Sequence, residues 1–249
     1  MVEKLKDNYD KKNIIITGAS RGLGLAILER LLNKNYIIHC VCRSLTPELE
    51  HYLDSNKNQV ILHTFDLEYL DGIPDLVAKI CKQYGPIYGL INNAAIGLDG
   101  LLATQHQSDI HRILRVNLEA PIIMTKYACR SMLAERSGRI INISSIIAQT
   151  GFNGLAVYGS TKAGLEGFTR SLSREVGRVG VTANCIAPGY METEMTSGLN
   201  SKKLESVRRR TSLGLPLPKD VASAAEYLLS KDSSMMTGTI MTIDGGSTA

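Results

Sequence analysis

Tyr158 and Lys162 are the pair of residues whose types and spacing most directly suggest chemistry. Residues four apart on a helix share one face, so we expect the Lys162 ammonium to lie beside the Tyr158 phenol. A nearby positive charge favours the phenolate and lowers the pKa of a tyrosine below its ordinary value of about 10. To lower this pKa to about 7, the surroundings must stabilise the phenolate relative to the phenol by roughly 4 kcal/mol. The pair is therefore a candidate proton donor and acceptor.

The same spacing recurs at Tyr227 and Lys231, so spacing alone does not select a reactive pair. The surroundings differ, because Ser145 precedes Tyr158 by thirteen residues at the end of a predicted strand, whereas Gly214 stands at that distance from Tyr227. We therefore interpret Tyr158 as the reactive tyrosine. The second pair is predicted to be part of an ordinary amphipathic helix.

A glycine-rich turn, TGASRGLG at 17–24, follows a β-branched run and opens a helical pattern. Gly18 allows a tight turn, Gly22 lets a phosphate approach the backbone, and Gly24 permits close packing of helix on strand. Backbone N–H groups and the positive end of the helix dipole would then face the phosphates. The strand–turn–helix context favours nucleotide binding over a plain turn.

The end of the second predicted strand carries information about the nucleotide. NAD sites usually place an acidic residue there, whereas NADP sites place a basic residue near the 2′-phosphate. Here the strand ends in CVCRS at 40–44, with no acidic residue. Arg43 and Arg21 can each pair with a phosphate through forked donors. Either arginine alone could simply be solvated, but together they favour NADPH.

The elements that must position these residues alternate along the chain. Strands are predicted at 13–17, 36–41, 60–65, 87–91, 139–144, 181–187 and 239–243, and helices at 22–33, 73–83, 108–134, 157–178 and 219–230. The strands are continuously apolar, which is typical of a parallel sheet covered on both faces. We predict an α/β fold: one doubly wound, Rossmann-type domain over 1–249, with a seven-stranded parallel sheet. The irregular stretch 188–218 is predicted to be a mobile lid or an ordinary surface excursion.

Composition excludes several other classes. The net charge is only +4, there is no Trp, and 5% of residues are aromatic, which argues against a nucleic-acid binder. No apolar run approaches the roughly 18 residues of a membrane helix, and residues 1–12 lack the apolar core of a signal peptide. Five cysteines without a C-x-x-C indicate reduced thiols in a cytoplasmic protein. The five histidines show no zinc-ligand spacing, so no metal is expected.

Along its whole length the sequence resembles the short-chain dehydrogenase/reductase family, most of all its 3-oxoacyl-[acyl-carrier-protein] reductase branch. The matching motifs, in family order, are 17–24, Asp66, Asn92-Asn93-Ala94-Ala95, Asn117, Ser145, Tyr158-x-x-x-Lys162, Pro188-Gly189 and Asp244-Gly245-Gly246. INISSIIAQTGFNGLAVYGSTKAGLEGFTRSL and CIAPGYMETEM carry the likeness to the branch. One departure is Ala95, where the family has glycine.

The resemblance implies a role for four residues in reducing a ketone. Tyr158 would donate the proton as general acid, and Ser145 would hold the carbonyl oxygen beside it. Lys162 would bind the nicotinamide ribose as well as act on the phenol. Asn117 resembles the family residue that holds a water in a proton relay towards Lys162.

The resemblance also implies a set of contacts to NADPH or NADP+. The cofactor-binding residues would be Gly18, Ser20, Arg21, Gly22, Leu23, Gly24, Arg43, Ser44, Asp66, Leu67, Asn93, Ala94, Tyr158, Lys162, Pro188, Gly189, Met191 and Thr193. Asp66 would meet the adenine amine, Asn93 the adenosine ribose, and Thr193 the carboxamide side of the nicotinamide. Asp66 could equally cap a turn, and Thr193 a helix.

The resemblance therefore implies that the protein is an enzyme, an NADP(H)-dependent short-chain oxidoreductase that reduces a 3-oxoacyl thioester to the 3-hydroxyacyl thioester. The alternatives are another ketone, alcohol or sugar as substrate and, in a different class, a non-catalytic NADPH-binding protein. An acidic acyl carrier protein could dock on basic residues, with Arg136, Arg178 and Arg208–Arg210 as candidates, although each could simply be solvated. The family's usual homotetramer, built on the two long helices and the last strand, is also expected.

Overall fold

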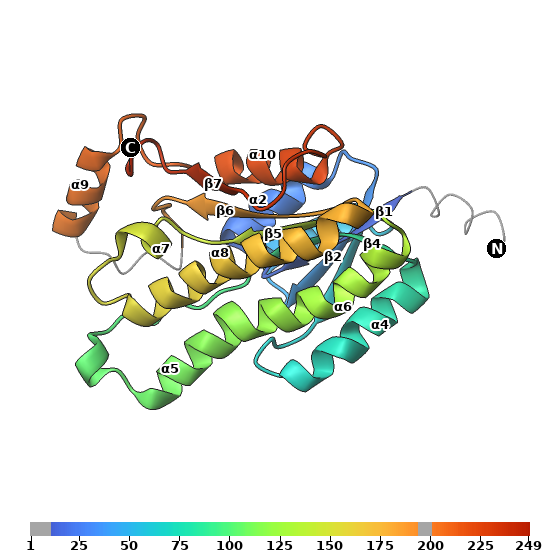
Figure 1. Ribbon diagram of the computed structural model, residues 1–249, viewed down its shortest axis with the longest axis horizontal. Coiled ribbons are helices and arrows are strands. Elements are labelled where there is room, and N and C mark those ends of the chain that lie inside the picture. The colour runs from blue at the N-terminus through green and yellow to red at the C-terminus, as the bar shows by residue number, and fades with distance from the viewer. Residues whose placement is uncertain (1–10, 194–200) are drawn as a thin grey trace.

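A seven-stranded parallel sheet forms the centre of the part of the protein that the computed structural model describes, residues 11–193 and 201–249 (Figure 1). The strand order is β3-β2-β1-β4-β5-β6-β7. The bounds are β1 Lys12–Thr17, β2 Tyr36–Cys42, β3 Val60–Thr64, β4 Ile87–Asn92, β5 Gly138–Ile143, β6 Val181–Pro188 and β7 Ile240–Ile243. The strand order reverses between β1 and β4, the place where ligands bind at the carboxyl edge of doubly wound sheets. The predicted fold class is confirmed.

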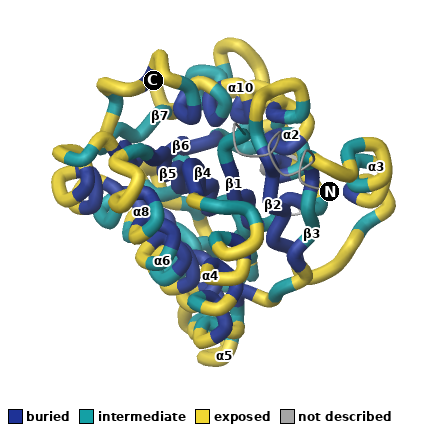
Figure 2. Tube along the Cα trace, turned by 90° about the vertical axis from the view of Figure 1, so that its right-hand side faces the viewer, coloured by how far each residue is buried: buried dark blue, intermediate teal, exposed yellow. Residues whose placement is uncertain are grey.

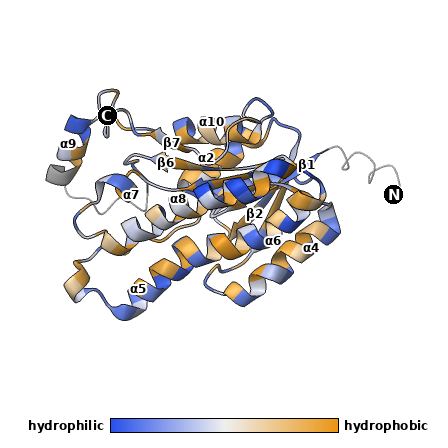
Figure 3. Ribbon diagram, in the orientation of Figure 1, coloured by the Kyte–Doolittle hydropathy of each residue, from blue (hydrophilic) through white to orange (hydrophobic). Residues whose placement is uncertain are grey.

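Helices cover both faces of this sheet. One face carries α2 (Gly22–Leu31), α3 (Pro47–Ser55) and α10 (Pro218–Leu229), and the other carries α4 (Ile73–Tyr84), α6 (Ala120–Ala134) and α8 (Ala156–Val176). Figure 2 shows the strands buried between these layers, and Figure 3 shows hydrophobic and hydrophilic residues alternating around α4 and α6. Among the described residues, no helix is long and apolar enough to cross a bilayer.

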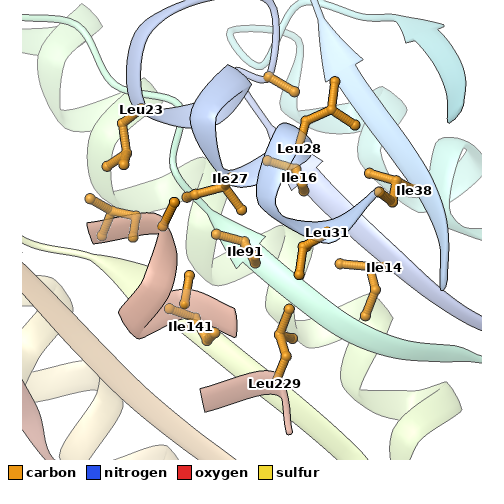
Figure 4. Close-up of a cluster of buried hydrophobic side chains, with 14 of the residues drawn as sticks. Ile14, Ile16, Leu23, Ile27, Leu28, Leu31, Ile38, Ile91, Ile141 and Leu229 are labelled. Atoms are coloured by element: carbon orange, nitrogen blue, oxygen red, sulfur yellow. The ribbon is translucent and has the colours of Figure 1, made fainter. Parts of the chain in front are cut away.

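β1 explains why the strands read as continuous apolar runs. Ile14 and Ile16 pack into the cluster under α2 and α10, shown in Figure 4 with Ile27 and Leu28. Ile15, between them, faces the cluster under α4 and α6 on the opposite side. Successive side chains of a strand point to opposite faces, so a strand covered on both sides has no solvent-facing side. The buried polar residues near the two ends of β1, Asn13 and Thr17, donate hydrogen bonds to backbone carbonyls.

The stretch predicted as one helix over 108–134 is divided. It consists of α5 (Gln107–Leu114), a π-helical segment at Arg115–Glu119 and α6. Pro121 has no N–H to bond the carbonyl of Asn117, and its ring would clash with that carbonyl in an α-helix. The wider π turn relieves this conflict and places Asn117, which is fully buried, inside the segment.

The stretch 188–218 contains a helix that the sequence analysis missed, α9 (Ser201–Arg210). Residues 194–200 of the predicted lid lie outside the described residues. Two other helices were missed, α3 and the single turn α7 (Ile147–Thr150). For α3 the signal was present, because Thr46 is the N-cap, accepting a hydrogen bond from the N–H of Leu49, and Pro47 opens the first turn.

Candidate active site and dinucleotide site

Ser145 and Tyr158 meet at the carboxyl edge of the sheet. Ser145 directly follows Ser144 beyond the end of β5, and Tyr158 lies in the first turn of α8. The Ser145 hydroxyl hydrogen-bonds the Tyr158 phenol, and Ser145 Oγ accepts a hydrogen bond of 3.2 Å from the N–H of Ile147. The Ile147 N–H occupies an oxygen lone pair of Ser145, which leaves its O–H to donate.

Lys162 lies one turn after Tyr158, and its side chain is only 2% exposed. Its Nζ is 5.5 Å from the centroid of the Tyr158 ring and donates a 2.8 Å hydrogen bond to the carbonyl of Ile143 at the end of β5. Burial lowers the pKa of Lys162 to about 8. Near neutral pH, Lys162 is therefore still protonated in most molecules.

The protein's own groups do not lower the pKa of Tyr158, and the lowering expected from Lys162 together with the oxidised nicotinamide stays a prediction. Burial raises the pKa of Tyr158 to about 12, the Asp99 carboxylate adds to the rise, and the hydrogen bond from Ser145 opposes it. Desolvation of the phenolate thus outweighs the favourable interactions that the protein supplies. At neutral pH the phenol keeps its proton, which is the form that a general acid needs.

Asn117 braces a loop beside this pair. Its Oδ1 accepts a 2.8 Å hydrogen bond from the N–H of Ile96, and its Nδ2 donates a 2.9 Å bond to the carbonyl of the same residue. The side chain therefore fixes the segment that leaves β4. The predicted role in a proton relay stays a prediction.

The glycine turn has the backbone that its three glycines allow. Gly18 and Gly22 have φ values of +68° and +54°, in the left-handed region where a Cβ is strained. A Cβ at Gly24 would overlap the carbonyl oxygen of Gly18. A Cβ at Gly18 would lie 2.9 Å from the Cα of Ala94, so the ends of β1 and β4 also approach closely.

Asn93 holds this turn from the neighbouring strand. Its Nδ2 donates to the carbonyls of Thr17 (2.9 Å) and Gly18 (3.1 Å). The Thr17 hydroxyl oxygen in turn accepts 3.0 Å bonds from the N–H groups of Asn93 and Ala94. The structure thus assigns Asn93 a bracing contact that the sequence analysis did not foresee, in addition to its predicted place near the adenosine ribose.

The donor set at the start of α2 suits a dinucleotide phosphate. Arg21 is the N-cap residue, yet its side chain makes no capping hydrogen bond, and the first turn of α2 contains no acidic residue. The first N–H groups and the positive helix dipole are thus not neutralised by a capping side chain. Gly22 and Leu23 follow, with Gly22 exposed at the surface. These residues fit a phosphate group.

The remaining predicted cofactor residues surround the turn. The Thr46 hydroxyl donates a 2.8 Å bond to the carbonyl of Ser20, which brings the segment containing exposed Arg43 and Ser44 beside the glycine turn. Across the site, Thr193 lies 3.9 Å from where a Cβ of Gly22 would be. Segments from both halves of the chain therefore meet here.

Further predicted residues have structural contacts of their own. Asp66 Oδ1 accepts a 2.9 Å bond from the N–H of Glu68, so this carboxylate caps a turn, while neighbouring Leu67 is buried. Pro188 ends β6, and the N–H of Gly189 donates a 2.8 Å bond to the carbonyl of Ile243. Met191 packs at the edge of the cluster under α2, and Ala95 is partly buried.

The basic residues considered for carrier-protein docking are exposed. Arg208 pairs with Glu192 at 2.5 Å, Arg209 is 3.9 Å from Glu205, and Arg210 donates to the Ser206 hydroxyl. Arg136 follows α6 with a φ of +50°, and Arg178 lies before β6.

The sequence analysis missed two acidic residues that act on Tyr158 or follow Lys162. Asp99 raises the pKa of Tyr158, and Glu166 is buried one turn after Lys162. Glu166 could have been noticed from its spacing, because residues 158, 162 and 166 follow each other at intervals of four on one helix. Nothing in the local sequence indicated that the charge of Asp99 acts on the Tyr158 phenol.

Comparisons with known proteins agree on one family. A family model described as short chain dehydrogenase matches residues 12–204. The 3-oxoacyl-[acyl-carrier-protein] reductase FabG of Vibrio cholerae is 34% identical over 242 residues, which cover 96% of this chain and 98% of the relative. The protein of the same name from Escherichia coli K12 is 33% identical with the same coverage.

Two solved structures superpose closely on the chain. One, titled ElxO with NADP bound, has a TM-score of 0.87 at 30% identity and covers 95% of this chain and 98% of its own. The other, from Agrobacterium tumefaciens and assigned as a gluconate dehydrogenase, has a TM-score of 0.89 at 27% identity and covers 95% of both chains.

Proposed function

Because this chain belongs to the short-chain dehydrogenase family, an oxidoreductase family, we propose that it reduces 3-oxoacyl thioesters to 3-hydroxyacyl thioesters with NADPH. The observation that carries the proposal is the Tyr158 phenol hydrogen-bonded to the Ser145 hydroxyl, with Lys162 Nζ 5.5 Å from the centroid of its ring. The relatives named as 3-oxoacyl-[acyl-carrier-protein] reductases support the substrate class. They also support an acyl carrier protein as the form in which the thioester arrives.

In this mechanism Tyr158 gives its proton to the carbonyl oxygen, while Ser145 holds that oxygen through a hydrogen bond. NADPH, when bound, would supply the hydride for the carbonyl carbon. Tyr158 is left as a phenolate, which the Lys162 ammonium stabilises by its charge. Proton return from solvent then restores the phenol, with Asn117 proposed to hold part of the relay.

We assign cofactor binding to the glycine turn, the end of β2 and the segment after β6. The N–H groups of residues 18–24 would receive the pyrophosphate, and Arg21 and Arg43 the 2′-phosphate. Asp66, Asn93 and Thr193 would contact the adenosine and nicotinamide ends. The similar structure titled with bound NADP supports NADPH over NADH.

Residues 188–218 are proposed to act as the substrate loop of a single catalytic domain spanning 1–249. α9 lies within this stretch, and its Arg208 pairs with Glu192 beside the glycine turn. Binding of substrate under such a loop would exclude water from the reacting carbonyl.

A tetramer is proposed through the outer sides of α6 and α8. A surface hollow between these helices is lined by the apolar residues Ile122, Leu133, Phe168 and Leu172. Ile122 and Leu133 are exposed in the single chain, as expected for residues that a second copy covers.

A substrate and cofactor panel tests the proposed function. The purified protein is assayed with an acetoacetyl thioester, a keto-sugar acid and a steroid ketone, each with NADPH and with NADH. We expect oxidation of NADPH with the thioester and little with NADH. Turnover of the sugar acid instead would favour the activity named for the Agrobacterium structure. NADPH binding without any turnover would indicate a binding protein.

A further inference from the structure

The end of β5 is joined to α8 by three side chains spaced one turn apart. Residues 143–145 run alongside this helix, and Tyr158, Lys162 and Glu166 face them. Tyr158 bonds Ser145, and Lys162 bonds the carbonyl of residue 143. The third contact, made by Glu166, has no place in the mechanism described so far.

Glu166 bonds the residue between the other two. Ser144 Oγ donates a 2.9 Å hydrogen bond to Glu166 Oε1 and a longer one, 3.3 Å, to the carbonyl of Lys162. Alternation along an extended chain turns Ser144 away from the direction of Ser145, towards the interior. Ser144 is 2% exposed and Glu166 4%, so this hydrogen bond is sheltered from water.

The other neighbours of Glu166 do not account for a carboxylate at this position. Its Oε2 is 3.9 Å from Nη1 of Arg170, whose side chain is mostly exposed, and such a pair contributes little to stability. Burying a carboxylate costs free energy, and an apolar side chain would pack α8 on the sheet at a lower cost. The bond to Ser144 is the specific interaction that an apolar residue could not make.

We propose that Glu166 is a positioning residue for the reduction. By holding the Ser144 hydroxyl, it fixes the end of β5, so that Ser145 meets the Tyr158 phenol and the carbonyl of residue 143 meets Lys162. The inference rests on the proposed function, because the step that benefits is the proton transfer from Tyr158. Small displacements of a catalytic group lower turnover strongly while leaving remote binding intact.

The first test replaces Glu166 in the full chain. Glu166→Ala is expected to lower kcat by roughly 10- to 100-fold with little change in the Kd for NADPH. Glu166→Gln keeps an oxygen acceptor for Ser144 and is expected to stay within about threefold of wild-type kcat. Wild-type kcat in Glu166→Ala, or no recovery in Glu166→Gln, would overturn the proposal.

The second test asks whether Glu166 acts through Ser144. Ser144→Ala is expected to lower kcat as much as Glu166→Ala does, and the double variant to be no worse than either single variant. Losses that multiply in the double variant would show that the two residues act independently, which contradicts the proposal.

Matched controls separate positioning from general damage to α8. Thr169 is buried one turn beyond, and its hydroxyl oxygen accepts a 2.8 Å hydrogen bond from Asn142. Thr169→Val is expected to lower the melting temperature while keeping kcat. Arg170→Gln removes the other charged neighbour of Glu166 and is also expected to keep kcat. A loss of kcat in either control equal to that of Glu166→Ala would refute the positioning role.

Hydrogen exchange of the backbone amides at 143–150 gives a readout that does not depend on turnover. Glu166→Ala is expected to speed exchange in this segment, whereas Thr169→Val leaves it unchanged. Unchanged exchange in Glu166→Ala would contradict the proposal even if the wild-type protein reduced no thioester. Inactivity of the wild-type protein across the substrate panel would instead count against the proposed function.

Discussion

Two tyrosine–lysine pairs with identical spacing have different surroundings in this protein. Tyr158 and Lys162 lie on α8 against the end of β5, with Lys162 buried. Tyr227, on α10 across the sheet, is 41% exposed, and exposed Lys231 lies beyond the end of that helix. The burial raises the pKa of Tyr158 to about 12 and lowers that of Lys162 to about 8. A strand end that carries Ser145, rather than the spacing, thus distinguishes the first pair.

Tyr158→Phe should give the largest effect, because it removes the proposed proton donor. We expect kcat to fall by about 10³-fold or more, while NADPH binding measured by fluorescence changes little. Tyr227→Phe is the matched control and should keep full activity. Substantial turnover in Tyr158→Phe would remove the general-acid assignment.

Lys162→Met should raise stability at pH 7 while abolishing most activity. The pKa of Lys162 is lowered from 10.5 to about 8, so the folded state disfavours its charged form by about 3 kcal/mol. This penalty is present below pH 8 and disappears as the pH rises from 8 to 10.5, where the unfolded chain binds more protons than the folded one. Denaturant unfolding of the wild type and of Lys162→Met at pH 7 and pH 10 measures the difference.

The corresponding change in the second pair sharpens this test. Lys231 is exposed, so Lys231→Met should leave the free energy of unfolding nearly unchanged at both pH values. Equal shifts in the two variants would mean that burial does not distinguish the lysines.

Ser145→Ala tests what the strand end contributes. The hydroxyl is proposed to orient the carbonyl oxygen, so we expect kcat to fall by about 10²-fold with unchanged binding of NADPH. Gly214, which stands at the same distance from Tyr227, serves as the comparison, and Gly214→Ser should create no new activity. If Ser145→Ala kept the wild-type kcat, the proposed role of the Ser145 hydroxyl in orienting the carbonyl oxygen would be wrong.

Arg43→Asp tests whether a dinucleotide with a 2′-phosphate binds beside the first pair. We expect kcat/KM with NADPH to fall by about tenfold or more relative to kcat/KM with NADH, because a carboxylate repels the phosphate and accepts from a ribose hydroxyl. Glu48 is exposed nearby on α3, and Glu48→Gln is the control that should keep the preference for NADPH over NADH. If Arg43→Asp also left this preference unchanged, Arg43 would not contact the 2′-phosphate.

The sequence was sufficient for the fold class and for most strand positions, because each of β1, β4 and β6 contains buried apolar residues that face both sides of the sheet. It was not sufficient for the helix over 108–134, where Pro121 changes the hydrogen-bond pattern inside a run that keeps its helical periodicity. α3 was also missed, although its N-cap signal was visible.

For the candidate site, the sequence alone determined which residue types occur at which spacing: the glycine turn, Ser145, and the tyrosine–lysine interval. Only the tertiary structure decided that burial and the charge of Asp99 raise the pKa of Tyr158, and that Glu166 bonds Ser144. The physical reason is that local geometry follows from short-range backbone preferences. Desolvation and long-range contacts depend instead on which distant segments pack around a group, and no local pattern records that.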